Sequence, residues 1–277
     1  MARILSIMNQ KGGVGKTTTA VNLGSYLAIK NRKILIIDMD PQANATCGVG
    51  IDTSNLELTV YDALIQGEDL INVVHPTSFA NLHIVPASPD LAGAEIELVA
   101  NVSRETILKS VLKSYGDSYD YIIIDCPPSL GLLTVNSLVA STGLIIPLQC
   151  EYFALEGLAH LLHTVDLIHE SFNPTLDILG ILPTMYDRRT TLSQEVLAEV
   201  KKSYDGRIFK TIIPRSVRLS ESPSHGLPIA LYSPESSGAL AYDKFSDEII
   251  EILEPIDNPD VAIVSRETIP SGGITHG

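Results

Sequence analysis

The chain has 277 residues, of which 45% are hydrophobic and 19% charged, so it can bury a large core and is not disordered as a whole. Its 19 lysine and arginine residues against 33 aspartate and glutamate residues give a formal charge of −14, which excludes a uniformly basic nucleic-acid binder. The three cysteines form no Cys-x-x-Cys pair, so they indicate neither a disulfide framework nor a zinc site and fit a reducing compartment.

Short apolar runs alternate along the chain with longer amphipathic stretches. Near-continuous Ile, Leu and Val content is typical of parallel strands buried on both faces, and the segments between them are long enough for crossover helices. The predicted strands are 3–9, 33–38, 82–86, 121–125, 143–148, 176–182 and 210–213, and the predicted helices include 16–30, 103–115, 154–171 and 193–204. The predicted fold class is therefore α/β, with a doubly wound, mostly parallel sheet flanked by helices.

One domain accounts for most of the chain. No Pro-, Gly- or Ser-rich linker interrupts residues 1–253, which predicts a single domain over that range, whereas the prolines and the Gly-Gly pair of residues 254–277 predict a flexible C-terminal tail. The uncharged stretch between Asp125 and Glu151 is punctuated by Pro and Gly, which favours a buried helix and a buried strand over a membrane span. The first residues show no signal-peptide pattern.

The sharpest motif lies between the first predicted strand and the first predicted helix. Its glycines let successive backbone N–H groups point at phosphate oxygens, while Lys16 reaches the outer phosphates and the Thr17 hydroxyl suits Mg²⁺. The motif departs from the standard P-loop because Gln10 stands where glycine is usual and Lys11 is an additional lysine. The predicted nucleotide-binding residues of this loop are Lys11, Gly12, Gly13, Val14, Gly15, Lys16, Thr17 and Thr18.

Acidic residues follow two further predicted strands, where a nucleotide-hydrolysing sheet would need them. If strand geometry persists through residue 40, the two-residue period places Asp38 and Asp40 on one face, near Mg²⁺ and an attacking water. Asp125 ends the apolar strand 121–125 in the manner of a Walker B motif and can hold Mg²⁺ through water. The sequence thus predicts Thr17, Asp38 and Asp125 as the metal site.

Together these motifs resemble the deviant Walker A ATPases of the MinD/ParA superfamily. The resemblance is carried by Lys11-Gly-Gly-Val-Gly-Lys16-Thr-Thr, Asp38-Met-Asp40-Pro-Gln and Ile124-Asp125-Cys-Pro-Pro. The nearest branch resembles the ParA/Soj partitioning ATPases, over residues 2–253, and the stretch Ile213–Gly226 is more specific to that branch than the P-loop.

The resemblance implies how the site works. In that family ATP lies between two subunits, so Lys11 is expected to reach the phosphates of a partner subunit as an arginine finger does. Asp40 is expected to position or activate the attacking water, and Pro214 to lie beside adenine. The implied catalytic residues are therefore Lys11, Lys16 and Asp40, the cofactors are ATP and Mg²⁺, and the ATP-bound state is a homodimer.

Basic charge is concentrated in one part of this acidic chain. Residues 188–218 hold eight basic and three acidic residues, a net charge of +5, which favours a basic surface on one face. The basic residues are Arg188, Arg189, Lys201, Lys202, Arg207, Lys210, Arg215 and Arg218. Arg189 and Arg218 match positions of DNA-contacting arginines in the family, which implies sequence-independent contacts with phosphates.

The implied function is an ATP-dependent switch for the partitioning of chromosomal or plasmid DNA. The ATP-bound dimer is expected to bind nonspecific double-stranded DNA, and slow hydrolysis, stimulated by a ParB/Spo0J-like centromere-binding protein, to release it. Slow intrinsic turnover is expected because no glutamine or arginine finger of the GTPase arrangement is visible. We expect a cytoplasmic protein associated with the nucleoid, without stable membrane association.

Three alternatives compete with this function. A MinD-like membrane-cycling ATPase, or another cargo-positioning ATPase of the family, shares the phosphate site, but membrane cycling needs a basic amphipathic helix, and the final helical pattern, 243–253, carries four acidic residues against Lys244. An iron–sulfur carrier needs suitably spaced cysteines. A hydrolase built on Ser224 and His225 lacks a nucleophile elbow.

Overall fold

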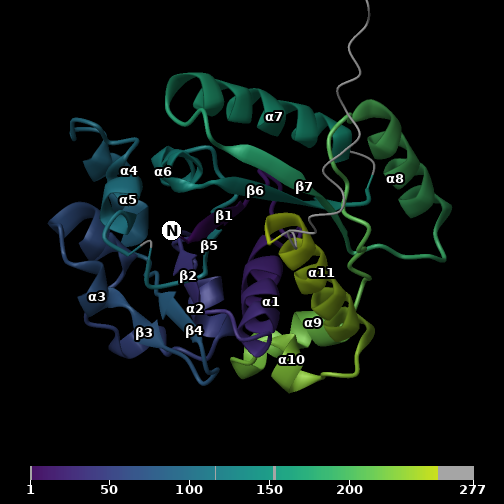
Figure 1. The fold of residues 1–277 in the computed structure, drawn as a ribbon, viewed down its shortest axis with the longest axis horizontal. Helices are drawn as coiled ribbons and strands as arrows, with labels where there is room; N and C mark the ends of the chain where they lie inside the picture. The colour runs from purple at the N-terminus through teal and green to yellow at the C-terminus, as the bar shows by residue number, and fades with distance from the viewer. Residues whose placement is uncertain (1, 116, 152–153, 255–277) are drawn as a thin grey trace, which may run out of the picture.

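The computed structural model describes residues 2–115, 117–151 and 154–254, and within them seven strands form one sheet (Figure 1). The strand order is β3-β4-β2-β5-β1-β6-β7, and all neighbours are parallel except β3 and β4. The bounds are β1 (Arg3–Ile7), β2 (Ile34–Asp38), β3 (His75–Pro76), β4 (Leu82–Val85), β5 (Tyr121–Asp125), β6 (Gly143–Gln149) and β7 (Asp177–Thr184). The predicted doubly wound α/β class is confirmed.

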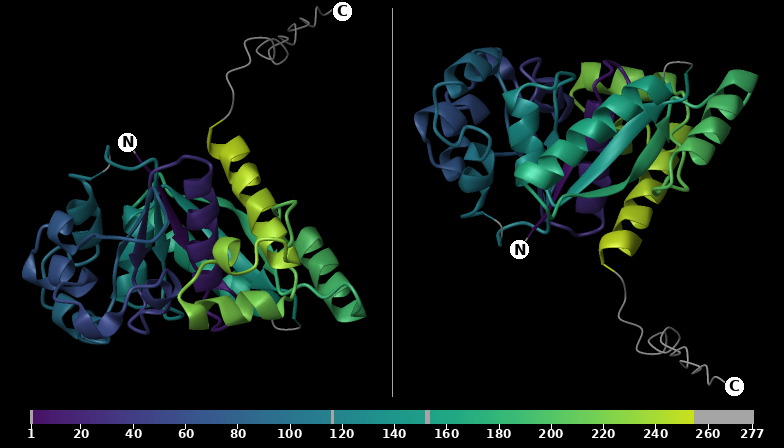
Figure 2. Two further views of the ribbon diagram at one scale, coloured as in Figure 1. Left: turned by 90° about the horizontal axis from the view of Figure 1, so that it is seen from below. Right: turned by 90° about the horizontal axis from the view of Figure 1, so that it is seen from above.

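Helices cover both faces of this sheet (Figures 1 and 2). Their bounds are α1 (Lys16–Ile29), α2 (Asn44–Gly48), α3 (Leu70–Val73), α4 (Leu91–Leu98), α5 (Ile107–Leu112), α6 (Leu132–Ala140), α7 (Ala154–Ser171), α8 (Thr191–Ser203), α9 (Val217–Glu221), α10 (Ile229–Tyr232) and α11 (Ser237–Leu253). Short 3₁₀ turns occupy Thr53–Asn55 and Ser222–His225, and a π-helical turn occupies Asp62–Gln66. The uncharged stretch after Asp125 forms the predicted helix and strand, α6 and β6.

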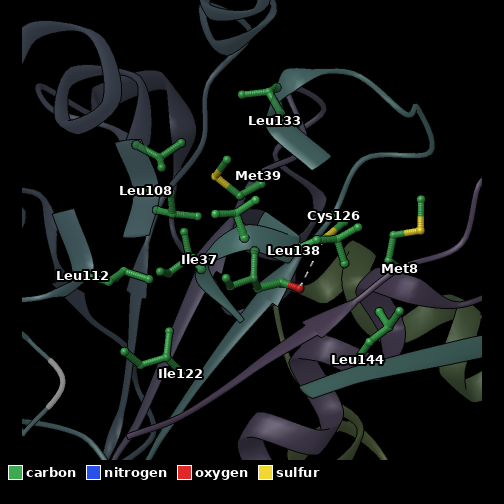
Figure 3. Packing of buried hydrophobic residues seen from close by; sticks show 14 of the residues in the cluster. Met8, Ile37, Met39, Leu108, Leu112, Ile122, Cys126, Leu133, Leu138 and Leu144 are labelled. Carbon is green, nitrogen blue, oxygen red and sulfur yellow. Dashed lines mark hydrogen bonds between the residues drawn. The ribbon is translucent and has the colours of Figure 1, made fainter. Parts of the chain in front are cut away.

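Strand alternation divides the buried side chains into two cores. In β2, Leu35 and Ile37 belong to the core beneath α4–α7, whereas Ile34 and Ile36 belong to the core beneath α1 and α11. Figure 3 shows Ile37 and Met39 packed with leucines of α5 and α6 in the first core. Because full burial of one such side chain contributes about 1.5–3 kcal/mol, a strand buried on both faces is held firmly.

The order of the strands brings the predicted site to one edge of the sheet. β1 lies between β5 and β6: the connection from β1 runs to β2 on one side of it, and the connection from β5 crosses to β6 on the other side. Ligands of α/β proteins bind at such a switch point. In the strand register, Ile7 lies opposite Asp125, which in turn lies opposite Asp38. The loop after β1 therefore starts next to both aspartates.

Residues 210–213 are not a strand, so that prediction is wrong. Isolated bridges lie on either side of the segment, Ile181 with Ile208 and Tyr186 with Pro214, and within it the Ile213 N–H donates to the Pro183 carbonyl of β7 at 2.9 Å. The second bridge is offset by one more residue than the first, and an extra residue interrupts a ladder as a bulge does. The N–H groups of Lys210 and Thr211 instead donate to the Glu248 carboxylate of α11, at 2.7 and 2.9 Å.

Two further differences concern the ends and the size of elements. The helix predicted over 103–115 is shorter, because Ser103 has a φ of +63°, which is not helical, and α5 starts only after Thr106. β3, which was not predicted, has two residues and is too short to show a period. The C-terminal tail predicted for 254–277 lies outside the described residues beyond Glu254. In the described part of the chain no helix combines the length and the apolar character of a membrane span.

Candidate functional site

The loop between β1 and α1 has the backbone of a phosphate cradle. Gly13 and Gly15 have φ angles of +75° and +92°, a region that glycine enters without strain and other residues rarely adopt. Gly15 is the N-cap of α1 and offers no side chain there, which leaves the first N–H groups of the helix open toward an incoming ligand. This backbone explains why glycines occupy these two positions.

Lys16 is buried at the start of α1 and is held inside the cradle. The residue is 6% exposed, and its Nζ donates to the Lys11 carbonyl oxygen at 3.1 Å. Burial lowers the pKa of the Lys16 ammonium, while the nearby Asp125, Cys126 and Asp40 side chains act in the opposite direction. A cation that is desolvated and pointed into a glycine loop is strongly attracted to phosphate oxygens.

A cavity of about 410 Å³ opens above the cradle, within the range of small-molecule sites. Of the predicted residues, the cavity wall contains Gly12, Gly13, Gly15, Lys16, Thr17, Thr18 and Asp40. The opposite walls come from the residues around α2 and from the Ser222–His225 turn, which meet where Gly50 and Gly226 touch backbone to backbone. The structure thus gathers most of the predicted nucleotide residues around one space.

Asp38 and Asp40 do not act as the alternating pair that strand geometry predicts, because β2 ends at Asp38. Asp38 is fully buried, and its carboxylate accepts hydrogen bonds from the Thr46 hydroxyl at 2.7 Å, the Thr46 N–H at 2.9 Å and the Asp40 N–H at 3.2 Å. Burial raises the pKa of Asp38 to about 6 against these hydrogen bonds. Asp38 therefore fixes the turn that leads to α2, whereas Asp40 lines the cavity.

Asp125 differs from Asp38 in having free oxygens. It is fully buried at the end of β5, and neither carboxylate oxygen makes a hydrogen bond of normal geometry within the described residues, although the Thr17 hydroxyl lies near enough to favour the charged form. Burial, and next the Asp38 carboxylate, raise the pKa of Asp125 well above its ordinary value, while the Thr17 hydroxyl and the Lys16 ammonium oppose this shift. An unpartnered buried carboxylate near the Thr17 hydroxyl fits a bound cation, which would satisfy the oxygens.

Lys11 lies outside the cavity, unlike the rest of the loop. Its side chain is 42% exposed, and its Nζ forms an ion pair with Glu151 Oε2 at 2.9 Å, beyond the end of β6. The Lys11 N–H is held by Asn9 Oδ1 at 3.0 Å, so the backbone of the loop is fixed while the ammonium stays at the surface. The structure therefore does not bring Lys11 to the nucleotide cavity of its own chain.

A second cavity of about 340 Å³ adjoins the first and contains Pro214. Both cavities share Gly15, Thr18, Met185 and Pro223. The Thr184 hydroxyl donates to the Val14 carbonyl at 2.8 Å and so ties the end of β7 to the cradle. Sequence reasoning missed Thr184 and Met185, because no local motif marks them, and it included Pro223 only within the Ile213–Gly226 stretch, without a role.

A basic groove of about 940 Å³ lies beyond this second cavity. The space between residues 186–189, residues 210–217 and α11 is called the basic groove below. The charged residues that line it are Asp187, Arg188, Arg189, Lys210, Arg215 and Lys244. Lys244 of α11 was missed, since it is surrounded in sequence by acidic residues. The other basic residues of 188–218, namely Lys201, Lys202, Arg207 and Arg218, do not line the groove.

Both arginines predicted to contact DNA are exposed and paired with a neighbouring acid. The Arg189 side chain, 87% exposed, donates through Nε and Nη2 to Asp187 at 3.0 and 2.8 Å, and these hydrogen bonds lower the pKa of Asp187 to about 2. The Arg218 side chain, 58% exposed, pairs with Glu221 at 2.9 Å. Exposed pairs of this kind are weak, so a phosphate can compete for either arginine.

The alternative sites do not assemble. Ser224 donates to the Glu221 carbonyl at 2.7 Å, and the His225 ring stacks on Tyr232, so these two residues form no nucleophile pair. Cys126 is buried and its pKa is raised to about 12 by burial, which disfavours a thiolate ligand. Among the residues that the structure describes, no group of three or more His, Cys, Asp or Glu side chains could hold a metal ion by itself.

Comparison with known proteins identifies relatives over most of the chain. The family described as "AAA domain" matches residues 2–178. The sporulation initiation inhibitor protein Soj of Bacillus subtilis is 54% identical over 90% of this chain and 98% of its own length, and the chromosome partitioning protein ParA of Myxococcus xanthus is 50% identical over 91% and 89%.

A solved structure shares the fold. The structure of cobyrinic acid a,c-diamide synthase from Mycobacterium smegmatis with bound ADP and magnesium superposes with a TM-score of 0.82 at 37% identity, over 92% of this chain and 96% of that chain. The activity in the name of that enzyme differs from partitioning, whereas two sequence relatives that are about half identical, ParA of Myxococcus xanthus and the ATPase Soj of Treponema pallidum, are named for chromosome partitioning. With the P-loop geometry described above, the chain belongs to the Soj/ParA family of chromosome-partitioning ATPases.

Proposed function

We propose that this chain is an ATP-dependent dimeric switch that holds and releases nonspecific DNA during chromosome or plasmid partitioning. The observation that carries the proposal is the position of Lys11, which belongs to the phosphate loop while its ammonium lies at the surface beside Glu151. A lysine placed there can neutralise charge on the phosphates of a nucleotide bound in a facing subunit. The catalytic site would then be complete only in a dimer.

Within one protomer, the residues of the cavity have distinct roles. The Gly12–Gly15 backbone and Lys16 bind the phosphates of ATP and neutralise their charge, which is most of what phosphoryl transfer requires of a protein. Asp40 lies on the cavity wall, where its carboxylate can orient a water and accept its proton. The base of ATP would occupy the second cavity beside Pro214 and Met185.

Thr17 and Asp125 are the residues we propose for Mg²⁺, with Asp125 acting through water. When bound, Mg²⁺ would neutralise charge on the β- and γ-phosphates. The free oxygens of Asp125 support this role, and the three hydrogen bonds on Asp38 favour a structural role for that residue instead of direct coordination. The Asp38–Thr46 contact keeps the Asp40 turn in place.

Dimerisation would convert a weak DNA binder into an effective one. Each protomer offers the exposed Arg189 and Arg218 and the cations of the basic groove, and joining two such surfaces raises the effective concentration of the second for the same duplex. Contacts through these residues would be made with phosphates and carry no sequence preference. If a dimer neutralises about four phosphates, log K should fall with log salt at a slope of about −3.6.

Two further features belong to the same proposal. A ParB-like partner with a basic segment would stimulate hydrolysis, and the net charge of −14 would favour that encounter. The protein would act in the cytoplasm, on the nucleoid. Its ATP and Mg²⁺ dependence follows from family membership and from the cradle geometry.

The decisive experiment measures binding to random-sequence duplex DNA with ATP, with ADP and without nucleotide, using Asp40→Ala protein to prevent turnover. We expect binding only with ATP, and affinity that falls steeply with salt. Lys11→Ala in the same background is the matched control, since it changes no residue of the basic groove and should lose the ATP-dependent gain. Absence of DNA binding while dimers still form with ATP would refute the DNA part of the proposal and direct attention to anionic lipid vesicles.

A further inference from the structure

Met185 occupies a strained position at the junction of the nucleotide cavities and the basic groove. It follows the last residue of β7 and has a φ of +50°, in the left-handed region that large non-glycine residues rarely adopt. Such a conformation persists only where the surrounding contacts impose it, and it is found most often at ligand sites and switch regions. The conformation at Met185 therefore depends on what its neighbours hold in place.

On one side, Met185 is connected to the nucleotide. The preceding residue, Thr184, is 2% exposed and donates to the Val14 carbonyl of the phosphate cradle at 2.8 Å. Met185 itself lines both the cavity above the cradle and the adjoining cavity that contains Pro214. A nucleotide that fills these cavities would contact Met185.

On the other side, Met185 leads directly into the basic groove. Tyr186 to Arg189 line that groove, and Asp187 accepts the N–H of Arg189 at 3.0 Å as well as its guanidinium, so the turn and the arginine move as a unit. Because the peptide at residue 185 sets the direction of the chain that follows, a change in its φ would reorient Arg189.

A second segment is hydrogen-bonded to the first. The Tyr186 N–H donates to the Ile213 carbonyl at 3.1 Å, and the Arg215 N–H donates to the Tyr186 carbonyl at 3.1 Å. Pro214 and Arg215 line both the second nucleotide cavity and the basic groove. The two segments thus form one hydrogen-bonded wall between the two sites.

We propose that Met185 is a positioning residue that couples nucleotide occupancy to the geometry of the basic groove within a single protomer. This inference rests on the proposed DNA-binding function and adds a second route from ATP to DNA, beside dimerisation. A nucleotide that contacts Met185 shifts the balance at residue 185 between the left-handed conformation and an ordinary one with negative φ. The change reorients the segment Tyr186–Arg189 and, through the hydrogen bonds between them, the segment Pro214–Arg215.

The test compares Met185→Gly with Met185→Leu, both in the Asp40→Ala background and at a nucleotide concentration that saturates each variant. Glycine removes the side chain that contacts the nucleotide and frees φ, whereas leucine keeps an apolar side chain and the restriction on φ. We expect Met185→Gly dimers to bind random duplex DNA at least about fivefold more weakly than dimers of the parent Asp40→Ala protein. Met185→Leu dimers should bind within about twofold of that parent. DNA should raise nucleotide affinity by the same factor that nucleotide raises DNA affinity, and this reciprocal gain should shrink in Met185→Gly.

A DNA-free measurement separates the inference from the proposed function. In the parent protein, nucleotide should change the hydrogen-exchange protection of the Tyr186 and Arg215 amides, and Met185→Gly should abolish that change. Ala43→Gly is the matched control, because Ala43 has a φ of +52° on the α2 side of the cavity and lines neither the groove nor the cavities. It should leave coupling intact.

Two outcomes would overturn the inference. One is a Met185→Gly dimer that binds DNA as tightly as the parent, with unchanged exchange behaviour at Tyr186. The other is an equal loss of coupling in Ala43→Gly, which would mean that general loosening of the cavity is responsible. If the parent dimer itself fails to bind DNA while nucleotide still changes the Tyr186 amide, the proposed function fails and the coupling stands.

Discussion

The nucleotide cavity and the basic groove lie on either side of Pro214 and Arg215, and they are built in opposite ways. The cavity depends on a few buried groups, such as Lys16, which is held against a backbone carbonyl at 3.1 Å. The groove depends on exposed cations, such as Arg189 with a side chain that is 87% exposed. A buried charge is strong and hard to replace, whereas exposed charges are individually weak, additive and screened by salt.

The largest expected effect is in the nucleotide cavity, where the charge is buried. Lys16→Ala removes the only phosphate-facing lysine of the described cavity wall and should weaken ATP and ADP binding by at least about 100-fold, as loss of one member of a buried charge pair does. Isothermal titration with each nucleotide measures this. Near-normal affinity would remove Lys16 from the phosphate site.

Asp40→Ala should separate binding from chemistry. Its carboxylate lines the cavity, so its removal should lower the hydrolysis rate by about 100-fold or more, the range expected of a general base, while ATP-dependent dimers and DNA binding remain. Phosphate release under saturating ATP and DNA measures the rate, and sedimentation measures the dimer. An unchanged rate would assign the water to another group.

Arg189→Glu combined with Arg218→Glu tests the exposed arginines that are proposed to bind DNA. We expect ATP-dependent dimers to persist and DNA affinity to fall at least about tenfold at about 0.15 M salt, with a flatter salt dependence, because phosphate contacts are lost. Lys201→Glu with Lys202→Glu is the control, since it makes the same change of charge on α8 outside the groove. Equal losses in both variants would show that the overall charge, and not this surface, determines binding.

The last prediction concerns the stability of the fold and not ligand affinity, through the contact that holds the turn between Asp38 and α2. Thr46→Val removes the hydroxyl that donates to Asp38 at 2.7 Å, so a buried carboxylate loses one partner and the free energy of unfolding should fall by about 1–3 kcal/mol. Urea unfolding in the absence of nucleotide measures it, and Thr46→Ser should retain most of the stability. If Thr46→Val is as stable as the parent, Asp38 is not held by this bond, and the water-mediated metal role predicted for Asp38 from the sequence regains support.

The cradle and the sheet were largely predictable because their signals are local. Gly13 and Gly15 have φ angles that only glycine adopts easily. Burial on both faces makes the central strands continuous runs of Ile, Leu and Val. Residues 210–213 were predicted as a strand although only Ile212 and Ile213 are apolar, and the N–H groups of Lys210 and Thr211 bond to Glu248 of α11 and not to β7. A window of sequence contains no information about such a distant acceptor.

Sequence alone therefore determined the phosphate loop, the acidic strand ends, the fold class and the presence of a basic region, since each arises from neighbours along the chain. Tertiary structure decided which of these residues act together. It tied Asp38 to Thr46, left Asp125 without a hydrogen-bond partner among the described residues, turned Lys11 toward Glu151 and added Lys244 to the basic groove. It also placed Met185 between the two sites. The physical reason is that burial, pairing and strain belong to contacts between segments far apart in the chain, which no local pattern specifies.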